Sequence, residues 1–262
     1  MRDGNISSHA PVLLAVFAHP DDESYRSGGT LALLARRGVC VQVLVATRGE
    51  AGSRGDPPLC TAEELPAVRE SELRCACSVL GIEPPRLLDY HDGRLKESKP
   101  EHLTEKILAV IRQVRPQVVL TFGPDGLSGH PDHVVIGQCA AEAYRRAEDL
   151  SALYALAVPR SVAERLHMQR IQPVPDEAIA MSVDVSPVWE AKLAAIRCHA
   201  TQLASSPMMR APVEQQHLFL GTEHFVLLAA RRPEEGVMQS LALQVRLCKA
   251  VAGTRMSLRS PI

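Results

Sequence analysis

The sequence predicts an α/β protein with a Rossmann-like, doubly wound, mostly parallel sheet and an elaborated C-terminal third. Short apolar runs alternate with longer amphipathic segments, which is typical of right-handed βαβ units. Of the 262 residues, 46% are hydrophobic and 23% are charged, as in an average globular protein. A chain of this length buries a large core as one domain.

The first three elements have the clearest signals. Residues 12–18 (VLLAVFA) form a continuous apolar run, typical of a strand that is buried on both faces. Residues 28–37 predict a helix, because Gly38 follows at the position where helices commonly end. Residues 39–46 are rich in valine and predict a second strand.

A loop over 47–60, which contains glycine and proline, leads to a helix predicted over 65–80. The pattern Thr61-x-x-Glu64 predicts a capping box at the start of this helix. Pro66 lies close to that start, and proline is tolerated only in the first turn of a helix. The beginning of this helix is therefore the least defined boundary.

The alternation continues to about residue 160. The apolar run QVVLTF gives the strongest strand signal here, whereas residues 86–89 give a weak one. The predicted strands are 86–89, 117–122 and 153–158, and the predicted helices are 101–114 and 132–146. In the C-terminal third, where the rhythm is less regular, we predict strands over 178–185 and 225–230 and a helix over 188–199.

The domain organisation follows from these elements. We expect a flexible N-terminus over 1–10, a single domain over 11–235, and an amphipathic helix or tail over 236–262. The last segment places apolar residues on one helical stripe beside several basic residues. Such a stripe packs on the body of the protein or on a neighbouring subunit more often than on a membrane.

Composition excludes several classes of function. With 29 Lys+Arg and 30 Asp+Glu, the net charge of −1 lacks the basic excess of a nucleic-acid binder. No run approaches the ~20 apolar residues that cross a bilayer. The seven cysteines are odd in number and scattered, so we expect free thiols in a reducing, cytoplasmic environment.

Two short motifs built on His-Pro-Asp carry the chemistry. AHPDDE (18–23) directly follows the first strand, and GHPDH (129–133) follows the strand over 117–122. Ligands of open parallel sheets bind where the strand order reverses, which in a 3-2-1-4 order lies between strands one and four. We therefore expect the two motifs to face each other across a cleft.

That cleft gathers three imidazoles and three carboxylates: His19, Asp21, Asp22, His130, Asp132 and His133. Two imidazoles and one carboxylate with one open position make a catalytic Zn²⁺ site. A single His-Pro-Asp is more often a capped turn, but two such motifs at cooperating strand ends favour a metal site.

The paired motifs resemble those of the LmbE-like/PIG-L superfamily of zinc-dependent N-acetylglucosaminyl deacetylases. AHPDDE followed by SGGTLA, and later GHPDH, carry the similarity. Weaker echoes extend it from about residue 11 to 230: Arg69-x-x-Glu72-Leu73, Asp92-Gly93, Lys192, His199-x-x-Gln202 and Glu223-x-Phe225.

The resemblance implies a role for each motif residue. One Zn²⁺ per chain is held by His19, Asp22 and His133. Asp21 is the general base, and His130 polarises the carbonyl or protonates the leaving amine. The implied substrate is a small amino-sugar conjugate that loses an N-acyl group, with sugar hydroxyls bound by Arg69 and Asp92.

Other readings remain open at this point. Arg69 and Glu72 also suit a solvent-facing ion pair, Asp92 a turn with Gly93, and His199 a structural hydrogen bond. The acidic run in the first motif suits a Mg²⁺ phosphoesterase, although imidazoles favour zinc. A nucleotide-binding module lacks G-x-G-x-x-G, and an inactive metal-binding relative is a further alternative.

Overall fold

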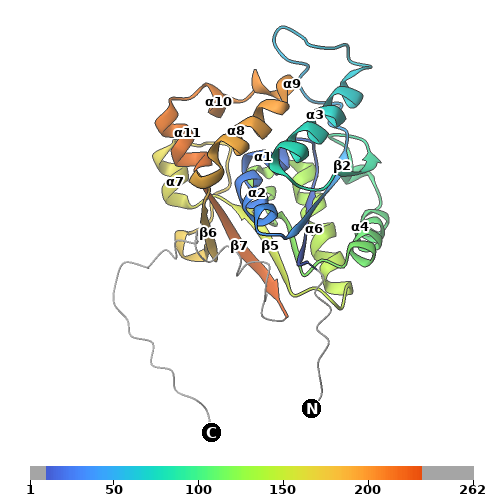
Figure 1. Ribbon diagram of the computed structural model, residues 1–262. Helices are drawn as coiled ribbons and strands as arrows, with labels where there is room; N and C mark the ends of the chain where they lie inside the picture. Colours follow the sequence, from blue (N-terminus) through green and yellow to red (C-terminus); the bar gives the residue numbers. More distant parts are fainter. Residues whose placement is uncertain (1–9, 232–262) are drawn as a thin grey trace, which may run out of the picture.

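The computed structural model describes residues 10–231 as one seven-stranded sheet with helices on both faces (Figure 1). The strand order is β3-β2-β1-β4-β5-β7-β6. The strands are β1 Val12–Phe17, β2 Cys40–Thr47, β3 Arg86–Tyr90, β4 Val118–Phe122, β5 Ala152–Ala157, β6 Met181–Asp184 and β7 Thr222–Ala230. The first five are parallel, and β7 runs antiparallel to both β5 and β6. The predicted fold class is confirmed.

The helices form two layers. Helices α2, α3 and α8 pack on one another, and α4 packs on α6 against β1 and β4 (Figure 1). Their bounds are α1 Asp22–Tyr25, α2 Gly28–Arg36, α3 Leu65–Leu80, α4 Pro100–Val114, α5 Gly126–Gly129, α6 Pro131–Arg146, α7 Arg160–Arg165, α8 Trp189–Cys198, α9 Ala200–Leu203, α10 Pro207–Arg210 and α11 Val213–Leu220. Short 3₁₀ turns occupy Leu95–Glu97, Asp176–Ala178 and Ser186–Val188.

The core lies between the sheet and these layers. β1 and β4 are almost entirely buried, as expected of central strands covered on both faces. Part of the interior is polar: the buried carboxylate of Glu223 accepts hydrogen bonds from the amides of Gly29 (2.9 Å) and Thr30 (2.7 Å) and from Lys192 Nζ (2.7 Å). This carboxylate ties the start of α2 to β7 and α8.

The predicted α3 agrees with the structure. It spans Leu65–Leu80, and Pro66 lies in its first turn. The capping-box bonds form immediately before it, because Glu64 Oε2 accepts from the Thr61 amide (2.9 Å) and Thr61 Oγ1 accepts from the Glu64 amide (3.3 Å). The predicted strand over 178–185 is too long, since Ala178 is the last residue of a 3₁₀ turn and pairing with β7 runs only from Met181 to Asp184.

The expectation of free thiols is wrong for two cysteines. Cys75 on α3 and Cys198 at the end of α8 form a disulfide, with Cα atoms 5.8 Å apart. The two residues are 123 positions apart in the sequence, and it is the packing of α3 on α8 that brings them together. Cys40, Cys60, Cys77 and Cys139 are free.

Within the described residues, every helix is too short or too polar to cross a bilayer. The N-terminus predicted over 1–10 falls almost wholly outside these residues, and so does the helix or tail predicted over 236–262. The single domain over 11–235, the cytoplasmic location and homo-oligomerisation stay predictions.

Candidate metal centre and active site

The first motif forms a tight turn at the carboxyl end of β1. Asp22 Oδ2 accepts hydrogen bonds from the amides of Ala18 (3.1 Å) and His19 (2.9 Å), which leaves Oδ1 facing the cleft. Asp21 adopts φ 107° and ψ −26°, a left-handed conformation that costs a non-glycine residue about 1–3 kcal/mol. Strain of this kind persists only where surrounding contacts enforce it.

The second motif begins α6, next to the end of β4. His130 is the N-cap of α6, and its Nδ1 accepts a hydrogen bond from the Asp132 amide (3.2 Å). His133 lies in the first turn of this helix. Its ring stacks on Phe122, with centroids 3.9 Å apart and planes at 9°, and its Nδ1 lies 3.1 Å from the Gly126 carbonyl oxygen. These contacts direct His133 Nε2 into the cleft.

The sheet brings the two motifs together as predicted, because β1 pairs with β4. His133 Nε2 lies 3.2 Å from His19 Nδ1 and 3.2 Å from Asp22 Oδ1, and His19 Nδ1 lies 3.7 Å from Asp22 Oδ2. Tetrahedral zinc with bonds of about 2.0–2.1 Å separates its ligand atoms by roughly 3.3 Å. The two 3.2 Å spacings around His133 Nε2 therefore fit ligands of one divalent metal, whereas the 3.7 Å distance joins His19 to the other Asp22 oxygen.

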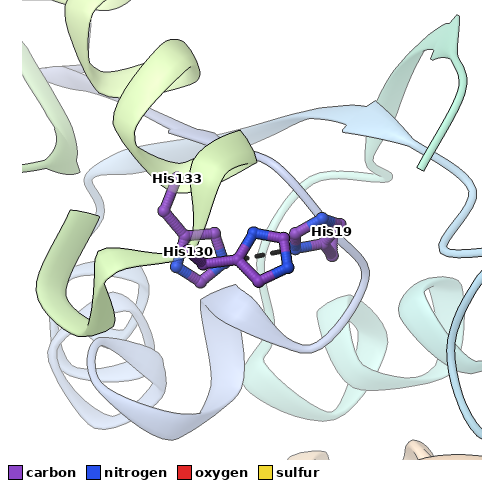
Figure 2. Close-up of side chains that lie close together, drawn as sticks. All are labelled: His19, His130 and His133. Carbon is purple, nitrogen blue, oxygen red and sulfur yellow. Dashed lines mark hydrogen bonds between the residues drawn. The ribbon is translucent and has the colours of Figure 1, made fainter. Parts of the chain in front are cut away.

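His130 also reaches this point. Figure 2 shows the rings of His19, His130 and His133 converging, and one nitrogen from each lies within 4.8 Å of the others. The ring centroid of His130 lies 4.9 Å from that of His19. Its Nδ1 is engaged by the helix cap, so Nε2 is the nitrogen left for the cleft.

Two carboxylates support the far side of His19. Its Nε2 lies 3.0 Å from Asp92 Oδ1 and 3.3 Å from Asp132 Oδ2. The nitrogen of a metal-binding histidine that faces away from the metal usually donates to such a group, which sets the tautomer and the ring orientation. His19, Asp92 and Asp132 also form a second set of ligand atoms within 4.8 Å. However, both Asp132 oxygens already accept backbone hydrogen bonds, from Gly93 (2.7 Å) and Leu95 (3.1 Å).

The charge of the cluster also suits a cation. Burial works to lower the pKa of His19, but the carboxylates of Asp132, Asp92 and Asp22 outweigh it and raise that pKa to about 10. In the other direction, the adjacent His133 and His19 overcome burial and hold the pKa of Asp22 far below its ordinary value. A divalent ion bound at this cluster would neutralise much of the negative charge of these carboxylates.

Asp21 lies beside the metal ligands. Its Oδ2 accepts a hydrogen bond from Arg69 Nη2 (3.1 Å), and 24% of its side chain is exposed. Burial raises the pKa of Asp21 to about 6, against the Arg69 cation, which lowers it, while Asp22 adds to the rise. A carboxyl group with a pKa close to neutral suits general base catalysis.

Arg69 reaches this site from α3. Its guanidinium also donates to the carbonyl oxygens of Gly49 (2.8 Å) and Pro20. The alternative of a solvent-facing Arg69–Glu72 pair is wrong, because both residues are buried. Glu72 instead accepts hydrogen bonds from the amide (2.8 Å) and the hydroxyl (2.7 Å) of Thr201.

All seven residues expected to act in the site line one open cavity of about 280 Å³. Its walls are formed by His19, Asp21, Asp22, Ala51, Gly52, Arg69, Asp92, Gly93, His130, His133 and Gln202. Larger hollows of about 420 and 480 Å³ elsewhere on the surface hold no comparable group of metal ligands among the described residues. The loop over 47–60 contributes two of these lining residues, Ala51 and Gly52.

Sequence reasoning did not assign roles to Glu23, Asp132 or Gln202. Gln202 Nε2 donates to the Ser53 carbonyl oxygen (2.7 Å), which joins α9 to the loop beside the cavity. Asp132 and Gln202 give no local signal of the backbone groups that they bind, because those groups belong to distant segments.

Comparison with known proteins shows which family this chain belongs to. The family model described as GlcNAc-PI de-N-acetylase matches residues 14–144, which contain both motifs. This chain belongs to the PIG-L (LmbE-like) family. Among curated members, it is 32% identical to the 1D-myo-inositol 2-acetamido-2-deoxy-alpha-D-glucopyranoside deacetylase of Mycobacterium sp. (strain JLS), over 86% of this chain and 85% of that protein. It is 33% identical to a probable N-acetyl-alpha-D-glucosaminyl L-malate deacetylase 2 of Bacillus cereus, over 72% of this chain and 83% of that one.

Solved structures share the fold of this PIG-L protein. The N,N'-diacetylchitobiose deacetylase of Pyrococcus horikoshii has a TM-score of 0.62 and 22% identity, over 84% of each chain. The 4-carboxy-2-hydroxymuconate hydratase of Pseudomonas putida KT2440 also has a TM-score of 0.62, with 21% identity, over 85% of this chain and 98% of that one. A deacetylase and a hydratase therefore share this fold, so the reaction has to be argued from the site.

Proposed function

We propose that this protein is a zinc-dependent N-deacetylase that removes an acetyl group from a small N-acetylglucosamine-type conjugate. The observation that carries the proposal is the His19, Asp22 and His133 cluster with the Asp21 carboxylate beside it in one cavity. The names of the curated relatives, which are deacetylases of glucosamine derivatives, support the substrate class.

His19 Nδ1, Asp22 Oδ1 and His133 Nε2 are the atoms proposed to hold the metal. Zinc bound by three such ligands supplies a Lewis acid at an open position, which lowers the pKa of water and polarises a carbonyl group. Phe122 and the Gly126 carbonyl orient the ring of His133, and the carboxylates of Asp92 and Asp132 orient that of His19, so that both ligand nitrogens would face the metal.

Asp21 is proposed to move the proton. Its carboxylate accepts a proton from the attacking water as the new bond from oxygen to the acyl carbon forms. It then delivers this proton to the amide nitrogen as the carbon–nitrogen bond breaks, which gives acetate and the free amine. Arg69, in contact with Asp21, favours the ionised form that the first step requires.

His130 is proposed to stabilise the oxyanion. Because its Nδ1 accepts the Asp132 amide proton, a neutral His130 carries its own proton on Nε2. Burial and the neighbouring His19 and His133 lower the pKa of His130, which keeps the ring neutral. A fixed N–H donor next to the metal site would stabilise the negative charge that develops on the carbonyl oxygen.

Arg69 and Asp92 are proposed to contact the sugar. Both line the cavity. Asp92 Oδ2 already accepts from the Ala51 amide (3.0 Å), but a carboxylate has about four acceptor sites, so capacity for a hydroxyl remains.

The test is release of free amine from a panel of N-acetylglucosaminides, together with metal analysis of the purified protein. We expect Asp21→Asn to retain zinc and to lose turnover by about 10²–10⁴-fold. His19→Ala and His133→Ala should lose both zinc and turnover. Amine release by none of the panel would overturn the function, and full turnover in Asp21→Asn would remove the base assignment. Magnesium in place of zinc, with phosphate-ester hydrolysis, would establish the phosphoesterase alternative.

A further inference from the structure

A buried acid and a buried imidazole lie directly behind the proposed general base. Glu23 and His199 are both fully buried, and His199 Nε2 lies 2.7 Å from Glu23 Oε1. They are 176 positions apart in the sequence: Glu23 is in α1, and His199 lies at the junction of α8 and α9. No step of the proposed reaction uses either residue.

The other oxygen of Glu23 contacts the base itself. Glu23 Oε2 accepts a hydrogen bond from the backbone amide of Asp21 (3.0 Å). This is the residue with φ 107°, a conformation that an aspartate does not hold without support. On the opposite side, Arg69 donates to the Pro20 carbonyl oxygen and to the Asp21 carboxylate (3.1 Å). The Pro20–Asp21 segment is therefore held from two directions.

A merely structural histidine would be expected to satisfy both ring nitrogens. His199 Nδ1 is buried and has no hydrogen-bond partner among the described residues. Buried polar atoms without partners are uncommon and call for an explanation. Among the described residues, the ring therefore makes its polar contacts through Nε2 alone, with Glu23 Oε1 and with the neighbouring Ser24 hydroxyl (3.5 Å).

We propose that Glu23 and His199 are positioning residues: His199 fixes the carboxylate of Glu23, which holds the Asp21 backbone in its left-handed conformation and so aims the Asp21 carboxylate into the cleft. This inference rests on the proposed function. Without Glu23, the Asp21 amide loses its partner and the chain relaxes away from φ 107°, which moves the base. A displacement of about 1 Å at a reacting group costs on the order of 100-fold in rate.

Substitutions of His199 provide a matched pair. In His199→Gln the side-chain amide takes the position of Nε2 and still donates to Glu23, whereas in His199→Asn it takes the position of Nδ1 and does not reach. We expect His199→Asn to lower kcat by about 10- to 100-fold with KM and bound zinc unchanged, and His199→Gln to restore most of kcat. A loss of kcat that is equal in the two variants, or that follows the loss of zinc, would overturn the proposal.

A double-mutant cycle with Asp21→Asn separates this inference from the proposed function. If the pair acts through Asp21, His199→Asn should cost little more once Asp21 is replaced. If the effects of the two substitutions on kcat are fully additive, the positioning role is wrong, even where Asp21→Asn alone greatly lowers turnover. Full turnover in Asp21→Asn would instead sink the base assignment on which the inference rests.

Crystal structures give a readout that does not depend on activity. In Glu23→Leu, which fills a similar volume without an acceptor, Asp21 should leave the positive-φ region, while in Glu23→Gln it should stay there. If the leucine variant does not fold, His199→Asn serves in the same comparison. Asp21 at φ near 107° in Glu23→Leu or, failing that, in His199→Asn would overturn the proposal.

Discussion

The Nε2 atom of His19 lies 3.3 Å from the carboxylate of Asp132, so the first His-Pro-Asp motif is supported by the aspartate of the second. The side chain of Asp132 is fully buried, and its two oxygens also hold the amides of Gly93 and Leu95. One carboxylate thus joins three segments: the turns after β1 and β3, and the start of α6.

Asp132→Asn should weaken metal binding about 10- to 100-fold, because the amide no longer fixes the His19 tautomer as a carboxylate does. It should also destabilise the fold by about 1–3 kcal/mol, since one of its buried acceptors becomes a donor. Competition with a chelator measures the affinity, and urea unfolding measures the stability. Asp184→Asn is the control, because Asp184 also accepts a backbone hydrogen bond (Ser186, 3.0 Å) but lies on the edge strand β6. Equal zinc affinity in the two variants would contradict this prediction.

Arg69→Gln should move the acid limb of the kcat profile to higher pH. Burial raises the pKa of Asp21 to about 6, and the Arg69 cation opposes that rise. Without the cation, the pKa of Asp21 increases further, so a larger share of the base is protonated at any pH on the acid side. Arg74→Gln on the same helix is the control, because Arg74 is exposed and pairs with Glu70. Superimposable profiles for the two variants would show that Arg69 does not tune the base.

Loss of the Cys75–Cys198 disulfide should destabilise the protein by about 3–5 kcal/mol, because the bond closes a loop of 123 positions in the unfolded chain. Guanidinium unfolding of the double variant Cys75→Ser, Cys198→Ser measures the change, and mass spectrometry of the wild type identifies the linked peptides. A reductant should lower the stability of the wild type to that of the variant and leave the variant unchanged. A wild type that is insensitive to reductant would speak against the bond.

His224 should make stability depend on pH. Its Nδ1 lies 2.8 Å from Ser182 Oγ, and burial, followed by the Arg26 cation, lowers its pKa to about 3. Between pH 6.5 and about 3 the unfolded chain therefore binds a proton that the folded protein does not, so stability falls as pH decreases, by up to about 1.4 kcal/mol per pH unit.

The matched variant is His224→Asn, which keeps a polar atom at the Nδ1 position and does not titrate. We expect the wild type to lose stability more steeply than this variant between pH 6.5 and 5. Urea unfolding of both metal-free proteins at several pH values measures the two slopes, with chelator present so that the metal ligands contribute equally. Parallel slopes would show that His224 has an ordinary pKa in the folded protein.

Local patterns were sufficient for the regular elements. The apolar run over 12–18 and the helix over 65–80 match β1 and α3 closely, because buried strands and capped helices carry their signals within a few residues. The shorter helices were missed, namely α1, α5, α7, α9, α10 and α11. Four of them (α1, α5, α9 and α10) have only four residues, too few for a helical period, and α1 is held by the burial of Glu23 and Ser24.

The sequence by itself determined the central part of the site. Two His-Pro-Asp motifs after the first and fourth strands, in a chain that alternates strands and helices, implied one cleft and the residues in it, since parallel strands end at the same edge of a sheet. Only the tertiary structure decided how those residues are held: Glu23 on the Asp21 backbone, Asp132 behind His19, and Cys75 joined to Cys198. His19 and Asp132 are 113 positions apart, the two cysteines are 123 apart, and Glu23 is itself held by His199, 176 positions away. Several of the partners are backbone atoms, which every residue carries. Local sequence patterns therefore do not predict these contacts, which form only when the chain packs.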